Sequence, residues 1–532
     1  MARILVVEPV ARAGLDVLEG SHATDVRLGL RRDDLLALLA EGGYEALVVR
    51  SQTRVDAGLL EVAAPRLSVV GVASVGTDKI DLAAATRAGV MVVNAPTGNT
   101  IAAAEHTMAL MLALLRRIPE ADASVRRGEW ERGRFTGAEL RHKTLGIVGL
   151  GKIGKQVARR AAAFEMRVLA HDPYLTADQA AEHGAKLVGF PELLLRSDVV
   201  TVHTPLTDAT RRMIASAQID AMKPGAYLLN VARGGIVDEP ALAAALRAGH
   251  LAGAAVDVFS SEPMADDNAL RDAPNLVLTP HLGASTAEAQ DRVAVEMAEQ
   301  LVEALAGVTP PYAVNAPAVA PDVLPRLRPY VELARRLAIL VRQLSPAPAG
   351  AIGLTYAGEI AASECAPIRT AALAGLLEAV TDQRVNAVNA DLVARERGLT
   401  VHETRTDAAE PWSSLVVLEA GEPDGGVRLA GSTAHGRPRL VSVDDFAIDA
   451  ELTGLILVTR HEDRPGIVGA VGTILAEAGI NISSLELSRR SAHGEAMMFV
   501  AVDDPVPDQV LERLRGVAGI GDALLVELPG LR

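Results

Sequence analysis

Short apolar runs and helical patterns alternate along the first half of the chain. β-branched residues dominate runs at 4–7, 46–49, 69–72 and 90–93, with helical periodicity between them, for example at 32–40. A second series of apolar runs occupies residues 144–148, 167–170, 199–202, 227–230, 254–258 and 276–279. Continuous apolar strands separated by helices are typical of parallel sheets with helices on both faces. The pattern therefore predicts an α/β protein with two doubly wound, Rossmann-like domains.

Two longer helical patterns adjoin these series. Residues 101–115 are almost entirely apolar, yet they include Glu105 and His106 and fall short of the roughly 20 residues that cross a bilayer, so we expect a buried helix. Residues 284–305 form an amphipathic pattern that could carry the chain back to the first sheet. We therefore expect one domain from residues 1–98 and 284–315, and a second from residues 99–283.

The rest of the chain divides into two further sections. Six prolines between Pro310 and Pro329 are expected to break any regular element, as are Pro346 and Pro348, so the first two domains should end near residue 315. Residues 318–450 mix helical patterns with strands, which predicts an α+β domain, and they contain no catalytic motif. Residues 455–532 follow the order strand, helix, strand, strand, helix, strand, which predicts a ferredoxin-like βαββαβ domain.

Composition and charge narrow the classes of function. A formal net charge of −15, without a dense run of Lys or Arg, argues against nucleic acid or an anionic membrane as the partner. Cys365 is the single cysteine, which excludes an intrachain disulfide and a multi-cysteine metal cluster, and no other convincing set of metal ligands is present. The apolar run at 4–7 ends at Glu8 and is too short for a signal peptide. We expect a cytoplasmic protein that works without a metal.

A glycine motif marks the start of the second sheet. Gly149, Gly151 and Gly154 follow a predicted strand and open a predicted helix, the context that a dinucleotide fingerprint requires. Asp172 ends the next strand, where a carboxylate can accept hydrogen bonds from the ribose hydroxyls of NAD and would repel the 2′-phosphate of NADP. The alternatives are a purely structural glycine turn and an Asp172 side chain that caps the turn before Pro173.

Three later strand ends carry candidate catalytic residues. Arg233, Glu262 and His281 follow successive predicted strands, and ligands of doubly wound sheets bind beyond the carboxyl ends of the strands. Taken singly, each has an ordinary alternative: a surface salt bridge, a solvated loop charge, or a histidine satisfied by backbone groups. Together they supply a base, a group that tunes the base, and a cation for a carboxylate, which is what the oxidation of a 2-hydroxy acid needs.

These motifs carry a family resemblance. Residues 3–315 resemble the D-isomer-specific 2-hydroxyacid dehydrogenases, whose arginine, glutamate and histidine match Arg233, Glu262 and His281 in order and context. Within that family, the segments at 232–239 and 281–286 are most similar to long-form phosphoglycerate dehydrogenases. The segments at 461–467 and 479–482 resemble an ACT domain, a small-molecule regulatory module. Residues 318–450 are similar to the intervening domain, which the family treats as an allosteric substrate-binding domain.

The resemblance implies a function and a set of site residues. It implies NAD-dependent oxidation of 3-phospho-D-glycerate to 3-phosphohydroxypyruvate, the first step of serine biosynthesis, in a homo-oligomer, expected to be a tetramer. His281 would accept the hydroxyl proton, Glu262 would orient its ring, and Arg233 would hold the substrate carboxylate. Cofactor contacts are implied for Gly149, Gly151, Lys152, Ile153, Gly154, Asp172, Thr204, Ala232, Arg233, Asp257, His281, Gly283 and Ala284. Substrate contacts are implied for Arg50, Ser51, Gly76, Asn99, Arg233 and His281.

The ACT-like section suggests an effector site. Backbone N–H groups at the helix that follows Pro465 and Gly466 suit a carboxylate. His461 and Asp463 stand at the strand end before that turn, and Asn481 opens the next strand. We expect L-serine to bind there and inhibit the enzyme. The alternative is that His461 and Asp463 only cap the turn and that the domain serves in assembly.

One departure from the family pattern concerns the substrate phosphate. Val72 stands where many relatives carry an arginine, and Lys79 stands where an asparagine is common. Phosphate binding would then fall to Arg50, to Lys79, or to Arg132 and Arg134 donated by a neighbouring subunit. The alternative functions are a dehydrogenase or reductase of glycerate, lactate or 2-hydroxyglutarate, and a non-catalytic NAD-sensing regulator. A free-standing amino-acid-binding regulator would explain only the last section.

Overall fold

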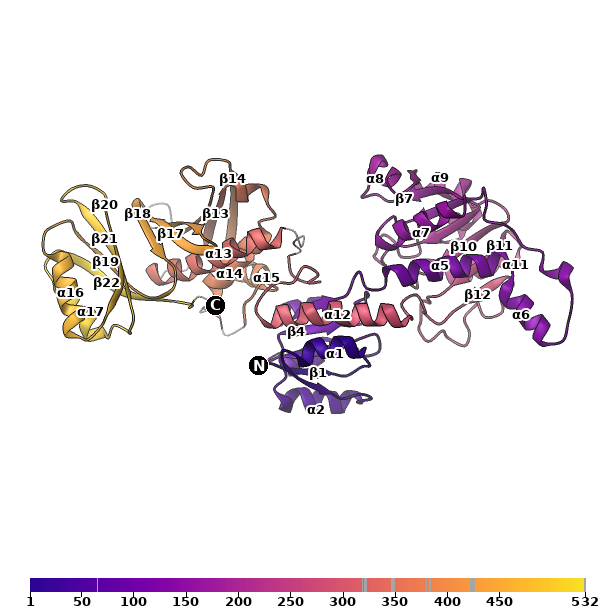
Figure 1. Ribbon diagram of the computed structural model, residues 1–532, viewed down its shortest axis with the longest axis horizontal. Coiled ribbons are helices and arrows are strands. Elements are labelled where there is room, and N and C mark those ends of the chain that lie inside the picture. Colours follow the sequence, from indigo (N-terminus) through magenta and orange to yellow (C-terminus); the bar gives the residue numbers. More distant parts are fainter. Residues whose placement is uncertain are drawn as a thin grey trace.

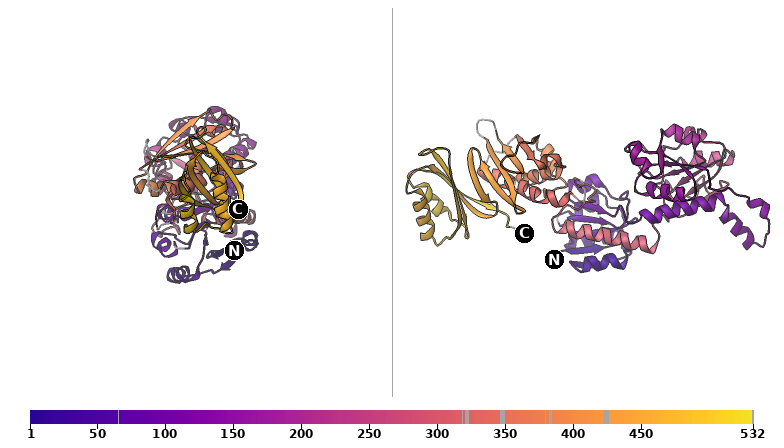
Figure 2. Two further views of the ribbon diagram at one scale, coloured as in Figure 1. Left: turned by 90° about the vertical axis from the view of Figure 1, so that its left-hand side faces the viewer. Right: turned by 45° about the horizontal axis from the view of Figure 1, so that its top comes forward.

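The protein is an elongated row of sheet-containing units. The computed structural model describes residues 1–532 except residues 65, 318, 320–322, 346–349, 379, 382–383, 422–425 and 531–532. Figure 1 shows the C-terminal sheet at one end of the row and the sheet that contains β10 at the other, with the N-terminal sheet between them and offset to one side. Figure 2 gives two further views of this arrangement.

The N-terminal sheet is parallel throughout, in the order β2-β1-β3-β4-β5. Its strands are β1 (Arg3–Val6), β2 (Ala23–Val26), β3 (Ala46–Val49), β4 (Val69–Val72) and β5 (Met91–Asn94). The helices α1 (Arg12–Glu19), α2 (Arg32–Gly42), α3 (Ala57–Ala63) and α4 (Leu82–Arg87) connect them. β2 was not predicted, because as an edge strand it lacks a fully buried residue and so shows no apolar run.

The second sheet is also parallel and has the order β12-β11-β10-β9-β6-β7-β8. Its strands are β6 (Thr144–Val148), β7 (Arg167–His171), β8 (Ala185–Leu187), β9 (Val199–Val202), β10 (Ala226–Asn230), β11 (Leu251–Val256) and β12 (Leu276–Leu278). Its helices are α7 (Lys152–Ala163), α8 (Ala177–Ala181), α9 (Phe190–Arg196), α10 (Ser216–Asp220) and α11 (Glu239–Arg247). The order reverses between β6 and β9, as in dinucleotide-binding folds, and the predicted doubly wound class is confirmed.

Two helices connect these sheets. α5 (Thr100–Leu115) leaves the first sheet and packs against α7 of the second. α12 (Ala287–Leu305) returns to the first sheet, where it contacts β4 and packs closely on α1. The α1–α12 contact requires glycine, since a Cβ at Gly14 would lie 2.6 Å from the Cβ of Ala294. A projecting segment of α6 (Ile118–Arg126) and the 3₁₀ helix η1 (Arg132–Phe135) follows α5 (Figure 1).

A third unit begins with a helix that sequence analysis did not predict. α13 (Leu324–Leu344) contradicts the expectation that prolines break all regular structure as far as Pro329. Pro325 is tolerated because it lies in the first turn, where a backbone N–H has no helical partner, while Pro329 inside the helix removes one hydrogen bond. Tertiary packing compensates, because nine residues of α13 are buried: Leu327, Leu333, Ala334, Arg336, Leu337, Ala338, Ile339, Leu340 and Val341.

α13 packs on a mixed sheet of order β14-β13-β15-β16-β17-β18, where β13 and β14 are parallel and the other pairs are antiparallel. The strands are β13 (Ala351–Gly358), β14 (Thr400–Thr406), β15 (Ser414–Ala420), β16 (Val427–Ala434), β17 (Arg437–Val443) and β18 (Phe446–Glu451). The other helices of this unit are η2 (Glu359–Ala362), α14 (Ala366–Leu377) and α15 (Ala390–Glu396). The α+β expectation is confirmed.

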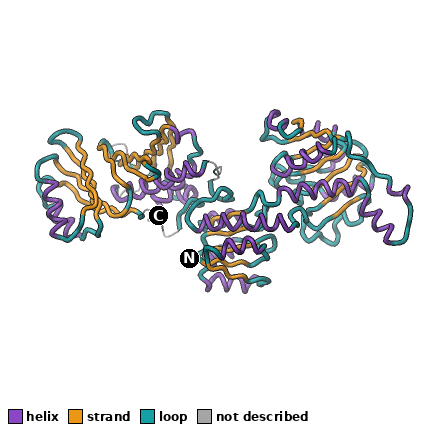
Figure 3. The backbone as a smooth tube through the Cα atoms, viewed as in Figure 1, coloured by secondary structure: helices purple, strands orange, loops and turns teal. Residues whose placement is uncertain are grey.

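The C-terminal sheet is antiparallel and has the order β20-β21-β19-β22, which confirms the ferredoxin-like prediction. Its elements are β19 (Gly454–Glu462), α16 (Ile467–Glu477), β20 (Ile482–Arg489), β21 (Glu495–Val502), α17 (Asp508–Arg515) and β22 (Ile520–Leu528). Figure 3 shows both helices on one side of this sheet. The other face joins the core of the α13 unit, and the buried Arg336 donates hydrogen bonds to the carbonyls of Leu452, Pro529 and Gly530. One face of the C-terminal sheet therefore shares a core with the α13 unit, while the helices on its other face enclose a second core.

The requirements of a membrane-spanning helix and of a metal site are not met in the described part of the chain. There, no helix combines the length and apolar character needed to cross a membrane. Nor do three or more His, Cys, Asp or Glu side chains gather there in a way that could hold a metal ion.

Candidate active site

The cofactor residues expected from the sequence all follow strands of the second sheet. The glycine motif lies between β6 and α7, Asp172 follows β7, and Thr204 follows β9. The remaining residues follow β10 (Ala232 and Arg233), β11 (Asp257) and β12 (His281, Gly283 and Ala284). Because parallel strands end at the same edge of a sheet, the fold brings these segments together around the point where the strand order reverses.

The glycine loop packs tightly against neighbouring backbone at Gly149 and Gly154 and leaves open space at Gly151. Gly149 has φ +92°, and a Cβ there would lie 2.7 Å from the carbonyl oxygen of His203. A Cβ at Gly154 would lie 2.2 Å from the carbonyl oxygen of Gly149, whereas one at Gly151 would meet no atom of a described residue within 4 Å. Among the described residues, no side chain caps the N-terminus of α7, so its first N–H groups are available to a pyrophosphate.

The two other residues of the motif have contacts within the protein. Ile153 packs against the hydrophobic core beneath the loop. The Nζ atom of Lys152 lies 4.9 Å from the ring centroid of Tyr312, on the segment that follows α12. Ala313, the next residue, pairs with Val93 of β5, so Lys152 contacts a segment that lies against the first sheet.

Asp172 and Thr204 also fit a dinucleotide. Asp172 accepts hydrogen bonds from the N–H groups of Leu150 (2.9 Å) and Tyr174 (3.0 Å), so it steadies the glycine loop and caps the turn after β7. Each carboxylate oxygen can accept a further bond from a ribose hydroxyl. The buried Oγ1 of Thr204 has no hydrogen-bond partner among the described residues, which is unusual for a buried hydroxyl and suits a ligand at this edge.

His281 and Glu262 form the central pair of the site. His281 Nδ1 lies 2.8 Å from Glu262 Oε2, and Glu262 Oε1 accepts a hydrogen bond from the N–H of Phe259 at 3.0 Å. The bond to Glu262 raises the pKa of His281, although partial burial opposes the shift. Burial would raise the pKa of Glu262, but the hydrogen bonds from His281 and Phe259 outweigh it and lower that pKa. Glu262 is therefore ionised when it faces the imidazole.

Asp257 holds the loop that carries His281. The fully buried carboxylate accepts hydrogen bonds from the Thr279 hydroxyl (2.6 Å) and the N–H groups of Leu282 (2.8 Å) and Gly283 (2.9 Å). Its backbone carbonyl accepts the N–H of His281 at 2.8 Å, and His281 has φ +55°, a conformation uncommon for a residue with a side chain. The loop therefore wraps around Asp257 and fixes the direction of the imidazole.

A helix of the same domain completes this anchor. Nε2 of His106, on α5, lies 3.2 Å from Asp257 Oδ1. Burial would raise the pKa of Asp257, but the hydrogen bonds from His106, Thr279 and Leu282 outweigh it and lower the pKa. Asp257 is thus an ionised, fully bonded anchor beneath the site.

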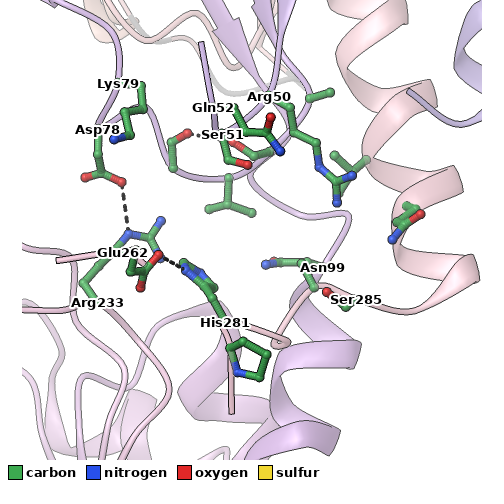
Figure 4. A pocket seen from close by; sticks show the side chains of 18 of the residues that line it. Arg50, Ser51, Gln52, Asp78, Lys79, Asn99, Arg233, Glu262, His281 and Ser285 are labelled. Carbon is green, nitrogen blue, oxygen red and sulfur yellow. Dashed lines mark hydrogen bonds and ion pairs between the residues drawn. The ribbon is translucent and has the colours of Figure 1, made fainter. Parts of the chain in front are cut away.

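A cavity of about 790 Å³ separates the two parallel-sheet domains. Figure 4 shows Arg50, Ser51, Gln52, Asp78 and Lys79 on one side, with Arg233, Glu262 and His281 on the other. All six substrate residues expected from the sequence line it: Arg50, Ser51, Gly76, Asn99, Arg233 and His281. The structure thus brings together segments that are more than 200 residues apart in the sequence.

Arg233 contacts the opposite side of the cavity. Its Nε atom lies 3.3 Å from Asp78 Oδ2, and its Nη1 donates to the carbonyl oxygen of Ala232 at 2.8 Å. A Cβ at Gly76 would lie 2.6 Å from Nη2 of Arg233, so glycine leaves the room that the guanidinium occupies. Arg233 therefore reaches across the cavity toward the first domain.

The expected phosphate ligands lie in different places. Lys79 and Arg50 line the cavity, whereas Val72 is buried in β4. Arg132 and Arg134 belong to η1 outside the cavity lining, where they stand over the rings of Trp130 and Phe135 respectively.

Sequence analysis missed polar residues at or beneath this site, among them Glu8, Gln52, Asp78 and His106. Glu8 and His106 were visible as polar interruptions of apolar runs. That signal could have marked them as buried polar groups, which need partners, but it could not have named the partners.

The expected effector residues do not bond to one another. His461 is buried and pairs with Thr459, its Nδ1 lying 3.2 Å from the hydroxyl. Asp463 accepts hydrogen bonds from Arg489 (2.8 Å) and from the N–H of His493 (3.0 Å). Asn481 donates to Asp503 at 2.7 Å. An amino acid that bound here would replace or share contacts that already exist.

Comparison with known families adds independent evidence. Residues 108–283 match the D-isomer specific 2-hydroxyacid dehydrogenase NAD binding domain. Residues 326–444 match the D-3-phosphoglycerate dehydrogenase intervening domain, and residues 455–519 match the ACT domain. The matches follow one another in the order expected from the sequence.

Full-length relatives extend this result. The D-3-phosphoglycerate dehydrogenase of Synechocystis sp. is 41% identical over 99% of this chain and 95% of its own length. The enzymes of that name from Archaeoglobus fulgidus and Bacillus subtilis are 40% and 39% identical, over 99% of this chain and 100% of their own lengths. The chain belongs to the D-3-phosphoglycerate dehydrogenase family. The family expected from the sequence is thereby confirmed.

Solved structures resemble more than half of the chain. The TT0316 protein from Thermus thermophilus is 38% identical, with a TM-score of 0.54 over 59% of this chain and 99% of its own. D-lactate dehydrogenase from Aquifex aeolicus, solved with NAD and lactic acid, is 29% identical, with a TM-score of 0.52 over 57% of this chain and 96% of its own.

Proposed function

We propose that this protein is an NAD-dependent dehydrogenase that oxidises 3-phospho-D-glycerate to 3-phosphohydroxypyruvate, the first step of serine biosynthesis. One observation supports it most: the His281–Glu262 pair, at 2.8 Å, opens into the same cavity as Arg50, Lys79 and Arg233. The cavity therefore offers a base and three cations, which suits a hydroxy acid that carries both a carboxylate and a phosphate. The similarity to D-3-phosphoglycerate dehydrogenases over almost the whole chain supports the same substrate.

Each residue of the site has a separate role in the proposed reaction. Bound NAD would supply the hydride acceptor, held by the glycine loop, Asp172 and Thr204. His281 Nε2, the nitrogen that Glu262 leaves free, accepts the proton of the C2 hydroxyl. Glu262 orients the ring and stabilises its protonated form. Arg233 holds the carboxylate through charge-assisted hydrogen bonds, and Asp78 yields its contact with Arg233 to the substrate.

The phosphate is proposed to bind at the first domain. Arg50 and Lys79 line that side of the cavity, opposite His281 (Figure 4). This placement separates the phosphate from the reacting carbon, as a three-carbon substrate requires. Arg132 and Arg134 of a neighbouring subunit remain a second proposal for the same group.

The substitution of Val72 for the common arginine favours one alternative, a dehydrogenase of a hydroxy acid without a phosphate, such as glycerate, lactate or 2-hydroxyglutarate. Steady-state assays with NAD and NADP, using 3-phosphoglycerate, glycerate, lactate and 2-hydroxyglutarate, distinguish the two. We expect the largest kcat/KM with 3-phosphoglycerate and NAD. A larger value with an unphosphorylated acid would replace the proposed substrate, and absence of turnover with every acid would support a non-catalytic regulator.

L-serine is the proposed effector, in a cytoplasmic homotetramer. The match to the ACT domain supports an amino-acid ligand, and the proposed pathway ends in serine. Calorimetry and activity assays with serine test the proposal, with Asn481→Ala as the variant and Asn268→Ala, which lies outside the C-terminal unit, as the control. Absence of both heat and inhibition at millimolar serine would contradict it. Analytical ultracentrifugation tests the tetramer.

A further inference from the structure

One buried carboxylate beneath the cavity binds four consecutive backbone N–H groups. Glu8, just after β1, is 4% exposed. Its Oε1 accepts from the N–H groups of Arg50 (3.0 Å) and Thr53 (2.8 Å), and its Oε2 accepts from those of Ser51 and Gln52 (both 3.0 Å). These four residues follow β3, some forty residues away in the sequence. The carboxylate therefore fixes the whole loop after β3.

Successive N–H groups that converge on one point form an anion-binding nest. This nest lies between the ends of β1 and β3, where the strand order of the first sheet reverses. In the flavodoxin-like fold, whose sheet has the order 2-1-3-4-5, a flavin cofactor with a phosphate can bind at that point. Here the protein's own carboxylate fills the position that an external anion would otherwise take.

Glu8 is ionised in this position. Burial raises the pKa of a carboxyl group, but hydrogen bonds from the N–H groups of Arg50, Thr53 and Gln52 outweigh it and lower the pKa of Glu8. The nest consequently holds a full negative charge at neutral pH.

The loop has two sides with different roles. Its N–H groups point to Glu8, while Arg50, Ser51 and Gln52 line the cavity. A substrate phosphate therefore meets side chains and not the backbone nest.

We propose that Glu8 is an internal anion that fills the nest after β3 and so presents Arg50, Ser51 and Gln52 to the substrate. Glu8 is a positioning residue, because it acts through that loop. The part of this inference that concerns substrate rests on the proposed function, whereas the occupation of the nest does not.

Glu8→Ala and Glu8→Gln test the inference, with Glu41→Ala on the exposed face of α2 as the control. Glu8→Ala should raise the KM for 3-phosphoglycerate about 10- to 100-fold, the scale of a positioning error of roughly 1 Å. The NAD dissociation constant should stay unchanged, because the nest lies outside the second sheet. Glu8→Gln should give a smaller rise in KM than Glu8→Ala, because the amide keeps one acceptor oxygen. KM should still rise above the wild-type value, because the amide NH₂ group turns a donor toward the remaining N–H groups.

Formate supplies the decisive readout. In Glu8→Ala, formate should enter the vacated space, lower the KM and raise the Tm, while neutral formamide should do neither. Wild type and Glu41→Ala should not respond in this way. An unchanged KM in Glu8→Ala, or a KM and Tm indifferent to formate, would overturn the inference.

The experiment distinguishes failure of the proposed function from failure of the inference about Glu8. If wild type does not oxidise 3-phosphoglycerate, the formate-dependent rise in the Tm of Glu8→Ala still tests the nest. If Glu8→Ala does not fold, Glu8→Gln with hydrogen exchange of the amides of Arg50 to Thr53 replaces it. Faster exchange of these amides relative to wild type supports the inference, and equal exchange contradicts it.

Discussion

Replacing Glu262 by glutamine tests the central pair most directly. The substitution keeps the size of the side chain but removes the charge that raises the pKa of His281. In the oxidation direction His281 must be neutral to accept a proton, so kcat/KM rises with pH through the His281 pKa. Glu262→Gln should therefore move this acidic limb to lower pH. In the reduction direction, where the protonated ring donates, the alkaline limb should also move to lower pH.

The exposure of the two side chains limits how much the His281–Glu262 hydrogen bond contributes to this shift in the pH profile. A hydrogen bond between charged groups contributes about 1.5–3 kcal/mol. The side chains of His281 and Glu262 are 46% and 38% exposed, so solvent screening reduces the contribution to roughly 1 kcal/mol. This contribution favours the protonated ring, so its loss should lower the pKa of His281 and move the limb to lower pH. Loss of the orientation of the His281 ring should also lower the plateau value of kcat/KM roughly 10- to 100-fold.

The measurement is a pH profile of kcat/KM in both directions, with isothermal titration of NAD as a check on folding. Glu182→Gln, an exposed glutamate of the same domain, is the matched control and should leave both limbs in place. A limb that does not move, or that moves to higher pH, in Glu262→Gln would refute the assignment of the pair. An unchanged plateau would show that Glu262 does not orient the ring.

Four further substitutions test other parts of the structure. His281→Ala should lower turnover about 10²- to 10⁴-fold with NAD affinity retained, and near-full activity at neutral pH would exclude it as the base. Wild type should prefer NAD, and Asp172→Ala should lower the ratio of kcat/KM with NAD to kcat/KM with NADP. A wild-type preference for NADP would contradict the assignment of Asp172 to the ribose site. Gly14→Ala should lower the free energy of unfolding in urea by roughly 1–3 kcal/mol, because its Cβ would lie 2.6 Å from that of Ala294. Arg336→Met should cost the C-terminal units roughly 2–4 kcal/mol, since the buried carbonyl of Leu452 and the part-buried carbonyls of Pro529 and Gly530 lose their donor; an unchanged calorimetric Tm would contradict this.

Local patterns in the chain determined much of the fold. β3, β4, β6 and β9 have the bounds that their apolar runs predicted, because a buried parallel strand needs apolar residues on both faces. The glycine motif and the three catalytic candidates were found because each follows an apolar run within a few residues. Position at a strand end is readable from sequence, and parallel topology then brings the ends to one edge.

Tertiary structure alone decided the features that join distant segments. α13 forms through Pro329 because burial of its apolar face outweighs one lost hydrogen bond, an energy that local proline rules leave out. Glu8 and His106 were visible only as polar residues in apolar runs, and their partners, the nest after β3 and Asp257, lie far away in the sequence. The alternation of apolar and polar residues reports which side chains are buried. It does not report which buried groups meet, since that depends on how separate elements pack.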